Sequence, residues 1–238
     1  MISTAMDTLL ADPWIAMTGI VAASASAVAG WQAKAMYTQW TRRQDLAAGA
    51  AQLKAARDAA RTAWTDTAED IPADLAADIT AADATTLLKH MHSQRWSAVD
   101  VMRVYCARAK LAGMVLNSNA EEMFADAVAA AQVAEANIAA GRARPLEGLP
   151  ISVKDQIKVA GTHATCGSAA LAAPGEQSQE DALIVRLMRD AGAIPFVRGN
   201  VPQCLMLPET DNNVWGRAVN PWSKHRTPYV APPCGLAH

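Results

Sequence analysis

The spacing of apolar residues along the chain predicts a helical first half. Residues 45–64 are rich in alanine and carry basic side chains on successive turns, which favours a helix. Thr80 with Asp83, and Ser97 with Asp100, have the spacing of helix capping boxes. Such starts, together with glycine stops, predict three further helices over residues 80–92, 97–113 and 119–138. We expect these helices to form a packed layer without chemistry of their own.

The pattern changes after Pro145. Alternating apolar residues at 149, 151 and 153 predict a strand, which residues 157–159 continue after a break. A loop over 161–175 follows. Ser178 and Asp181 then begin a predicted helix, and residues 194–197 form a short apolar strand. The apolar face of this helix comprises Leu183, Ile184, Leu187, Met188 and Ala191. Strand, helix and strand at this spacing indicate a parallel β-α-β unit, and hence an α/β fold.

Composition excludes several classes of protein. The chain has 238 residues, of which 51% are hydrophobic, but 53 of these are alanine, so the core is expected to be helix-rich with small side chains. This composition excludes a disordered, collagen-like or disulfide-based protein. A net charge of −2 gives no electrostatic footprint for nucleic acid. The four cysteines show no spacing typical of a zinc site, and no metal is expected.

Residues 13–33 form an uncharged stretch that is long enough to span a bilayer. Asp7 and Asp12 precede it and Lys34 follows it, so the charge bias would leave the rest of the chain cytoplasmic. The stretch is rich in alanine, serine and glycine, so a helix that is soluble or lies on a surface is the alternative. The chain is therefore expected to be cytoplasmic, or membrane-associated with its later part in the cytoplasm.

Lys154 is the first candidate for chemistry. It follows Val153 in the predicted strand and faces away from the apolar side of that strand. If both faces of the strand are covered, the lysine is buried, and burial favours the neutral amine that can act as a base. The alternative is a solvated lysine beside Asp155. Spacing alone leaves both interpretations open.

Several motifs resemble the amidase signature family. Residues 148–155 (GLPISVKD) resemble the lysine motif of that family, and residues 161–168 (GTHATCGS) resemble the loop that follows it. Residues 181–203, and then 216–228 with Asn220-Pro-Trp222, are similar to later motifs in the same order. The resemblance covers about residues 75–228 and is greatest to the fatty acid amide hydrolase branch. It implies the N-terminal part of the amidase signature fold, a mixed sheet covered by helices and preceded by further helices.

The resemblance also implies a mechanism and a set of site residues. The family hydrolyses amide bonds with a serine nucleophile, a bridging serine and a lysine base, and needs no cofactor. Lys154 occupies the position of the lysine base. Cys204, Leu205 and Met206 fall near the positions that line the substrate channel. A small-molecule amide is the implied substrate, with a membrane as a possible further partner.

The resemblance ends abruptly after Pro228, where the family has a run rich in glycine and serine. No serine follows Ser223 in these 238 residues, so both catalytic serines are missing. We expect the chain as written to be truncated and inactive. The alternative is a non-catalytic, membrane-tethered protein with an interaction role. The expected organisation is an N-terminal segment over 1–40, a helical linker over 41–74, a partial amidase domain over 75–228 and an unrelated, loosely packed tail over 229–238.

Overall fold

The computed structural model describes residues 13–173 and 175–223 of the chain, with side chains described from residue 24 onward. Residues 1–45 and 46–238 form two compact units. The helix α2 (Pro13–Ala63) contains the boundary between them. The predicted helix over 45–64 is thereby confirmed as the last third of α2. The tail predicted over 229–238 lies outside the described residues.

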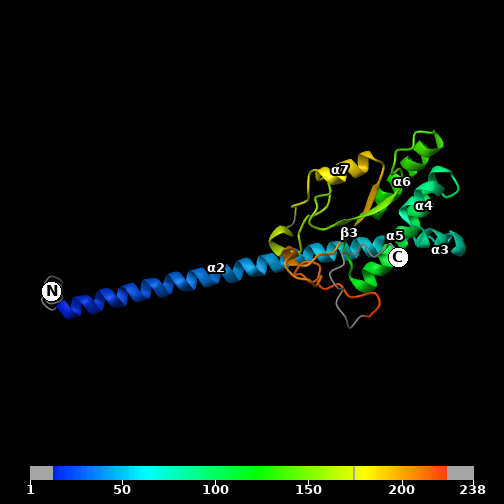
Figure 1. The fold of residues 1–238 in the computed structure, drawn as a ribbon. Coiled ribbons are helices and arrows are strands. Elements are labelled where there is room, and N and C mark those ends of the chain that lie inside the picture. The colour runs from blue at the N-terminus through cyan, green and yellow to red at the C-terminus, as the bar shows by residue number, and fades with distance from the viewer. Residues whose placement is uncertain (1–12, 174, 224–238) are drawn as a thin grey trace. The chain divides into compact units, whose positions relative to one another are not determined.

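A three-stranded sheet forms the centre of the second unit (Figure 1). Its strand order is β1 (Asn119–Glu122), β3 (Ile194–Gly199) and β2 (Pro150–Lys154). The strands β2 and β3 are parallel and are joined through α7 (Leu183–Asp190), which confirms the predicted β-α-β unit. The strand β1 is antiparallel to β3, so the sheet is mixed, as the resemblance implied.

Helices cover both faces of this sheet (Figure 1). On one face, α5 (Ala98–Leu116) and α6 (Phe124–Ala139) pack against β3. The buried stripe of α6 is largely alanine, and these small side chains let α5 approach closely. On the other face, Val185 of α7 packs against Val153 and Val159. The helices α3 (Ala73–Ala81) and α4 (Ala84–His92) form a second core with α5 around Ile79 and Met91.

The capping predictions were correct for one helix and wrong for another. Ser97 caps α5, where its hydroxyl accepts a hydrogen bond from the Asp100 amide at 3.2 Å. Asp83, rather than Thr80, caps α4, because its carboxylate accepts from the Thr86 amide at 2.7 Å. Thr80 lies inside α3, a helix that the sequence pattern did not reveal.

Two predicted boundaries around β1 were also wrong. The helix α5 continues through Gly113 to Leu116, and Asn117 caps it with a backbone φ of 51°. Residues 119–122 form β1 instead of beginning a helix, and α6 starts only at Phe124. The side-chain amide of Asn119 donates to the Ala109 carbonyl at 2.8 Å, which fixes the strand against α5.

The later predictions need two corrections. Residues 157–159 form no strand, because the chain turns after Lys154, where the Ile157 amide donates to the Lys154 carbonyl at 3.0 Å. The helix α7 has no side-chain cap and begins only at Leu183. Most of its predicted apolar face is exposed in this chain: Leu183, Ile184 and Leu187 have more than half of their surface accessible.

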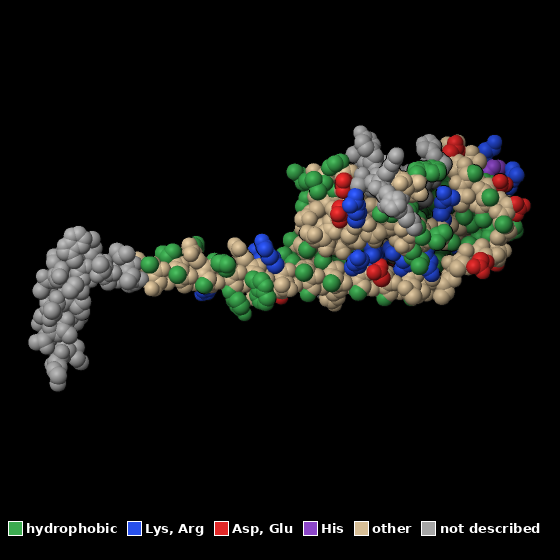
Figure 2. All heavy atoms as spheres, turned by 90° about the horizontal axis from the view of Figure 1, so that it is seen from below, with side chains coloured by type: hydrophobic (Ala, Val, Ile, Leu, Met, Phe, Trp, Pro, Cys, Tyr) green, Lys and Arg blue, Asp and Glu red, His purple; other side chains and the backbone are tan. Residues whose placement is uncertain are grey.

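Residues 13–33 are helical, but the predicted membrane span is not supported. Within residues 13–173 and 175–223, no helix is both long and apolar enough to cross a membrane. The physical reason is composition, since alanine, serine and glycine add little to the free energy of membrane insertion. Figure 2 shows one face of the molecule, where basic and acidic side chains are both present at the surface.

Candidate active site

Lys154 is the last residue of β2 and pairs with Gly199 of β3. The lysine is half-buried rather than fully buried. No hydrogen bond or ion pair of its Nζ atom is found among the described residues. The backbone beyond it is fixed, since the Asp155 amide donates to the Gly199 carbonyl at 2.9 Å. Lys154 therefore extends from a strand end that backbone hydrogen bonds hold, and its Nζ atom has no partner within the part of the chain that the structure describes.

Asp155 ties the following loop to this strand end. Its Oδ2 atom accepts from the Thr165 hydroxyl at 2.6 Å and from the Gly167 amide at 3.3 Å. The Thr165 hydroxyl in turn accepts from Trp215 Nε1 at 3.1 Å. Burial raises the pKa of the Asp155 carboxyl above its usual range, and these hydrogen bonds offset only part of that effect. Its Oδ1 atom is buried without a partner in the described part of the chain.

Arg198 of β3 clamps the turn that follows Lys154. Its guanidinium is fully buried and donates to the carbonyls of Asp155 and Ile157, both at 2.6 Å. It also donates to the Lys154 carbonyl at 3.3 Å and to the Thr162 hydroxyl. Burial lowers the pKa of Arg198, while the nearby Asp155 carboxyl acts in the opposite direction. The turn is thus held by one cation that binds several backbone oxygens.

A carboxylate–imidazole pair joins β1 to the same loop. Glu121 accepts from the His163 amide through one oxygen, and its other oxygen contacts His163 Nδ1, both at 2.8 Å. The sequence pattern does not reveal this pair, because it predicts that Glu121 belongs to the first turn of a helix. It also does not reveal Arg198, because a single arginine at the end of a short apolar strand carries no signal of burial.

The predicted channel residues Cys204, Leu205 and Met206 lie at the short helix η2 (Gln203–Leu205) and just after it. All three are exposed. The Cys204 amide donates to the Cys166 carbonyl at 2.8 Å, so this segment contacts the loop that Asp155 holds. None of the three side chains has a hydrogen bond to Lys154 in the described part. Lys154 and the predicted channel residues are therefore connected through the loop over 161–168, and not by direct side-chain hydrogen bonds in the described part.

The buried side-chain amide of Asn212 holds the chain on both sides of η2. Asn212 donates to Asn200 Oδ1 and to the Val201 carbonyl, both at 2.7 Å. Its own Oδ1 atom accepts from the amides of Val214 and Trp215. Because both ends of this side chain are engaged, residues 200–215 form a fixed loop beside the end of β3.

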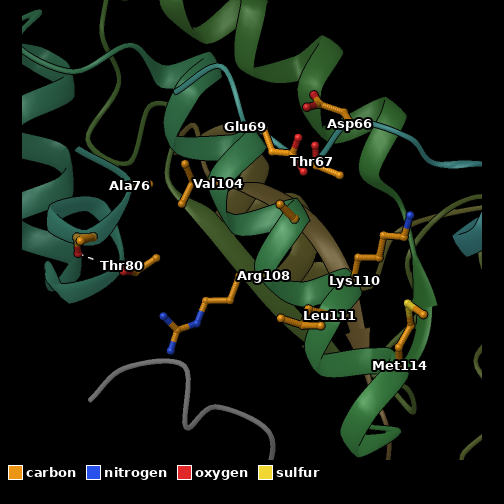
Figure 3. A pocket seen from close by; sticks show the side chains of 12 residues that line it. Asp66, Thr67, Glu69, Ala76, Thr80, Val104, Arg108, Lys110, Leu111 and Met114 are labelled. Atoms are coloured by element: carbon orange, nitrogen blue, oxygen red, sulfur yellow. Dashed lines mark hydrogen bonds between the residues drawn. The ribbon is translucent and has the colours of Figure 1, made fainter. Parts of the chain in front are cut away.

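A separate cavity of about 650 Å³ lies between α3, α5 and the segment that follows α2 (Figure 3). Its walls are mostly apolar and include Val104, Leu111 and Met114. Asp66 at its edge is engaged by Arg103 at 2.7 Å. Neither Lys154 nor the η2 segment lines it. Among the described residues, no group of three His, Cys, Asp or Glu side chains could hold a metal ion.

Comparison with known sequences relates the chain to amide hydrolases. The family model described as Amidase matches residues 100–229. The chain is 37% identical over 151 residues to a putative amidase, kk1C, of Curvularia clavata. It is 39% identical over 147 residues to an acetamidase of Aspergillus oryzae. These matches cover 63% and 60% of this chain but only 28% and 26% of the two relatives. The chain therefore spans little more than a quarter of their length.

Solved structures show the same fold. A fatty acid amide hydrolase superposes with a TM-score of 0.58 over 72% of this chain and 30% of its own, at 22% identity. The peptide amidase of Stenotrophomonas maltophilia gives a TM-score of 0.56 over 65% of this chain and 34% of its own, at 26% identity. The mixed sheet and its covering helices are thus a shared architecture.

Proposed function

Because the chain belongs to the amidase family, we propose that it carries the lysine base of an amide-hydrolysing site and that Lys154 is this base. One observation carries the proposal. The Lys154 Nζ atom has no partner among the described residues, while the backbone around it is held by β3 and by Arg198. A general base needs this combination, because it must be positioned and yet able to accept a proton.

The reaction needs two hydroxyl groups besides the lysine. A serine hydroxyl is too weakly acidic to attack an amide unaided. In the proposed site, the Lys154 amine takes a proton from a bridging serine, which takes one from the attacking serine. Backbone N–H groups of a glycine-rich loop then stabilise the oxyanion. The relay gives a proton to the leaving amine when the carbon–nitrogen bond breaks, which leaves the acyl group on the attacking serine. Water then attacks this ester, passes a proton back through the relay, and releases the carboxylic acid and the free serine.

The 238 residues alone are proposed to be inactive. No serine follows Ser223 in them. Ser152 is exposed on β2, and Ser168 lies in the loop, but in the described part of the chain neither has a hydrogen bond to Lys154. A lysine without an adjacent hydroxyl relay has no nucleophile to activate, so we propose that hydrolysis requires the serine-bearing segment that the family places after the matched region.

The proposed substrate is a small amide with an apolar acyl group. Leu205 and Met206 are exposed beside the loop that Asp155 anchors, and they would offer an apolar wall with Cys204. The acetamidase of Aspergillus oryzae, at 39% identity, makes acetamide the first substrate to test. In a chimera that restores the serine-bearing segment, Met206→Ala should raise the KM for longer acyl amides more than the KM for acetamide.

A chimera tests this proposal. Residues 1–228 are joined to the part of the Aspergillus oryzae acetamidase that follows its matched region, and ammonia release from acetamide is followed. We expect the chimera to hydrolyse acetamide and the 238-residue chain not to do so. Turnover by the purified 238-residue chain that disappears in its Lys154→Ala variant would refute the claim of inactivity. Lys158→Ala, an exposed lysine four residues away, serves as the matched control.

A further inference from the structure

Two cysteines from distant parts of the sequence meet beside the candidate site. The Cys204 amide donates to the Cys166 carbonyl at 2.8 Å. Standard bond lengths on either side of this 2.8 Å contact place the two Cα atoms no more than about 6.7 Å apart. That separation falls within the roughly 4.4–6.8 Å that disulfides span. Both thiols are free.

The backbone on either side holds this approach in place. A Cβ atom added to Gly167 would lie 3.2 Å from the Gln203 Cα atom, so the two segments pack directly on one another. Asp155 anchors the first segment through Gly167, and the Gln203 amide donates to the Asp211 carbonyl at 3.1 Å in the second. The two segments are therefore held against one another at the place where the two cysteines meet.

Solvent exposure distinguishes Cys166 and Cys204 from Cys106, the third cysteine among the described residues. Cys204 is exposed and Cys166 is half-buried, whereas Cys106 is fully buried in the core between α5 and α6. Burial raises the pKa of Cys106 to about 12, so its reactive thiolate is scarce. Burial also raises the pKa of Cys166, while the nearby Lys154 acts in the opposite direction. An oxidant in solution therefore meets Cys204 first.

We propose that Cys166 and Cys204 form a reversible disulfide that locks the loop over 161–168 to the η2 segment. Hydrogen peroxide is the oxidant. The Cys204 thiolate attacks one peroxide oxygen, which gives a sulfenic acid and, after protonation, one water. The Cys166 thiolate then attacks the sulfenic sulfur, forms the S–S bond and releases a second water. Two thiols lose two protons and two electrons, and peroxide is reduced to two waters. The proposal does not depend on amide hydrolysis.

Peptide mapping tests the disulfide. The full chain is treated with hydrogen peroxide, blocked with N-ethylmaleimide and digested with trypsin. Cys166 then lies in the peptide over 159–186 and Cys204 in the peptide over 199–217. We expect these two peptides to be linked, with the mass of two hydrogen atoms missing, and to separate after reduction. Cys106, in the peptide over 104–108, should remain a thiol in the folded chain.

Three results would overturn the proposal: separate alkylation of both cysteines after peroxide treatment, a link from either one to Cys234, or a link between two chains on a non-reducing gel. The Cys234→Ser variant should still form the predicted link. A second readout is thermal. Closing this loop should raise the Tm of the oxidised chain by about 5–10 °C. The Cys204→Ser variant should show no such shift after the same treatment.

Discussion

Replacing Arg198 with methionine removes the buried guanidinium that holds the turn after Lys154, and it keeps most of the side-chain volume. The carbonyls of Asp155 and Ile157, which accept from the guanidinium at 2.6 Å, would lose a charged donor in a buried place. The longer bond to the Lys154 carbonyl and the bond to the Thr162 hydroxyl would also be lost.

The expected cost follows from these contacts. Leaving a buried acceptor unsatisfied costs about 1–3 kcal/mol, and two short bonds are broken. The variant also avoids the cost of burying the arginine itself, which offsets part of this loss. Asp155 meanwhile loses the cation that favours its ionised form. We therefore expect Arg198→Met to lower the free energy of unfolding by about 2–4 kcal/mol.

The assay is urea unfolding of the full chain, monitored by far-ultraviolet circular dichroism. The midpoints of the variants are compared after checking that their m-values, the dependence of the free energy on urea concentration, are equal. Arg95→Met is the matched control, because Arg95 is exposed and no hydrogen bond or ion pair of its side chain is found in the described part. The control should change stability by less than about 0.5 kcal/mol. An equally small loss in Arg198→Met would refute the argument that the arginine clamps the turn.

Three further predictions concern the loop and α7. Burial raises the pKa of Asp155, so in the folded chain its carboxyl keeps a proton that the unfolded chain releases. The free energy of unfolding should therefore fall as pH rises above about 4. Urea titrations at several pH values should show that Asp155→Asn removes this part of the fall. Gly167→Ala should cost about 2–4 kcal/mol, because its φ is +67° and the new Cβ would lie 2.7 Å from Asn212 Cβ. Gly161→Ala, with a φ of +79° and open space around it, should cost only about 1–2 kcal/mol in the same unfolding assay. We expect the full chain to self-associate through the exposed apolar face of α7, so Leu187→Lys should lower its light scattering without lowering the Tm. Equal light scattering of the two proteins would contradict this expectation.

The elements set by local signals were predictable from the sequence. Ser97 begins α5 as its capping pattern indicated, and the alternation at 149–153 gave β2 with the correct parallel partner. The start at Asn119 was wrong, because an asparagine followed by acidic residues has the pattern of a helix N-terminus. Its role is decided by pairing with β3, which lies some 75 residues later and carries no local signal.

The candidate site was predictable only in part. The motif around Lys154 was visible as a resemblance, but the residues that hold it were not. Arg198 reads as an ordinary polar strand end, and its burial depends on carbonyls from a different segment. Glu121 and His163 are 42 positions apart and meet only in the folded chain. Long-range contacts of this kind have no periodic signature.

The most direct measurement of the central claim is the kcat/KM for acetamide of the chimera and of its two lysine variants. General base catalysis contributes about 10²–10⁴-fold to rate, so Lys154→Ala should lower kcat/KM by that factor while Lys158→Ala leaves it nearly unchanged. Circular dichroism spectra and melting curves of the three proteins should be the same. Equal kcat/KM values for the folded Lys154→Ala and Lys158→Ala variants would contradict the assignment of Lys154 as the base.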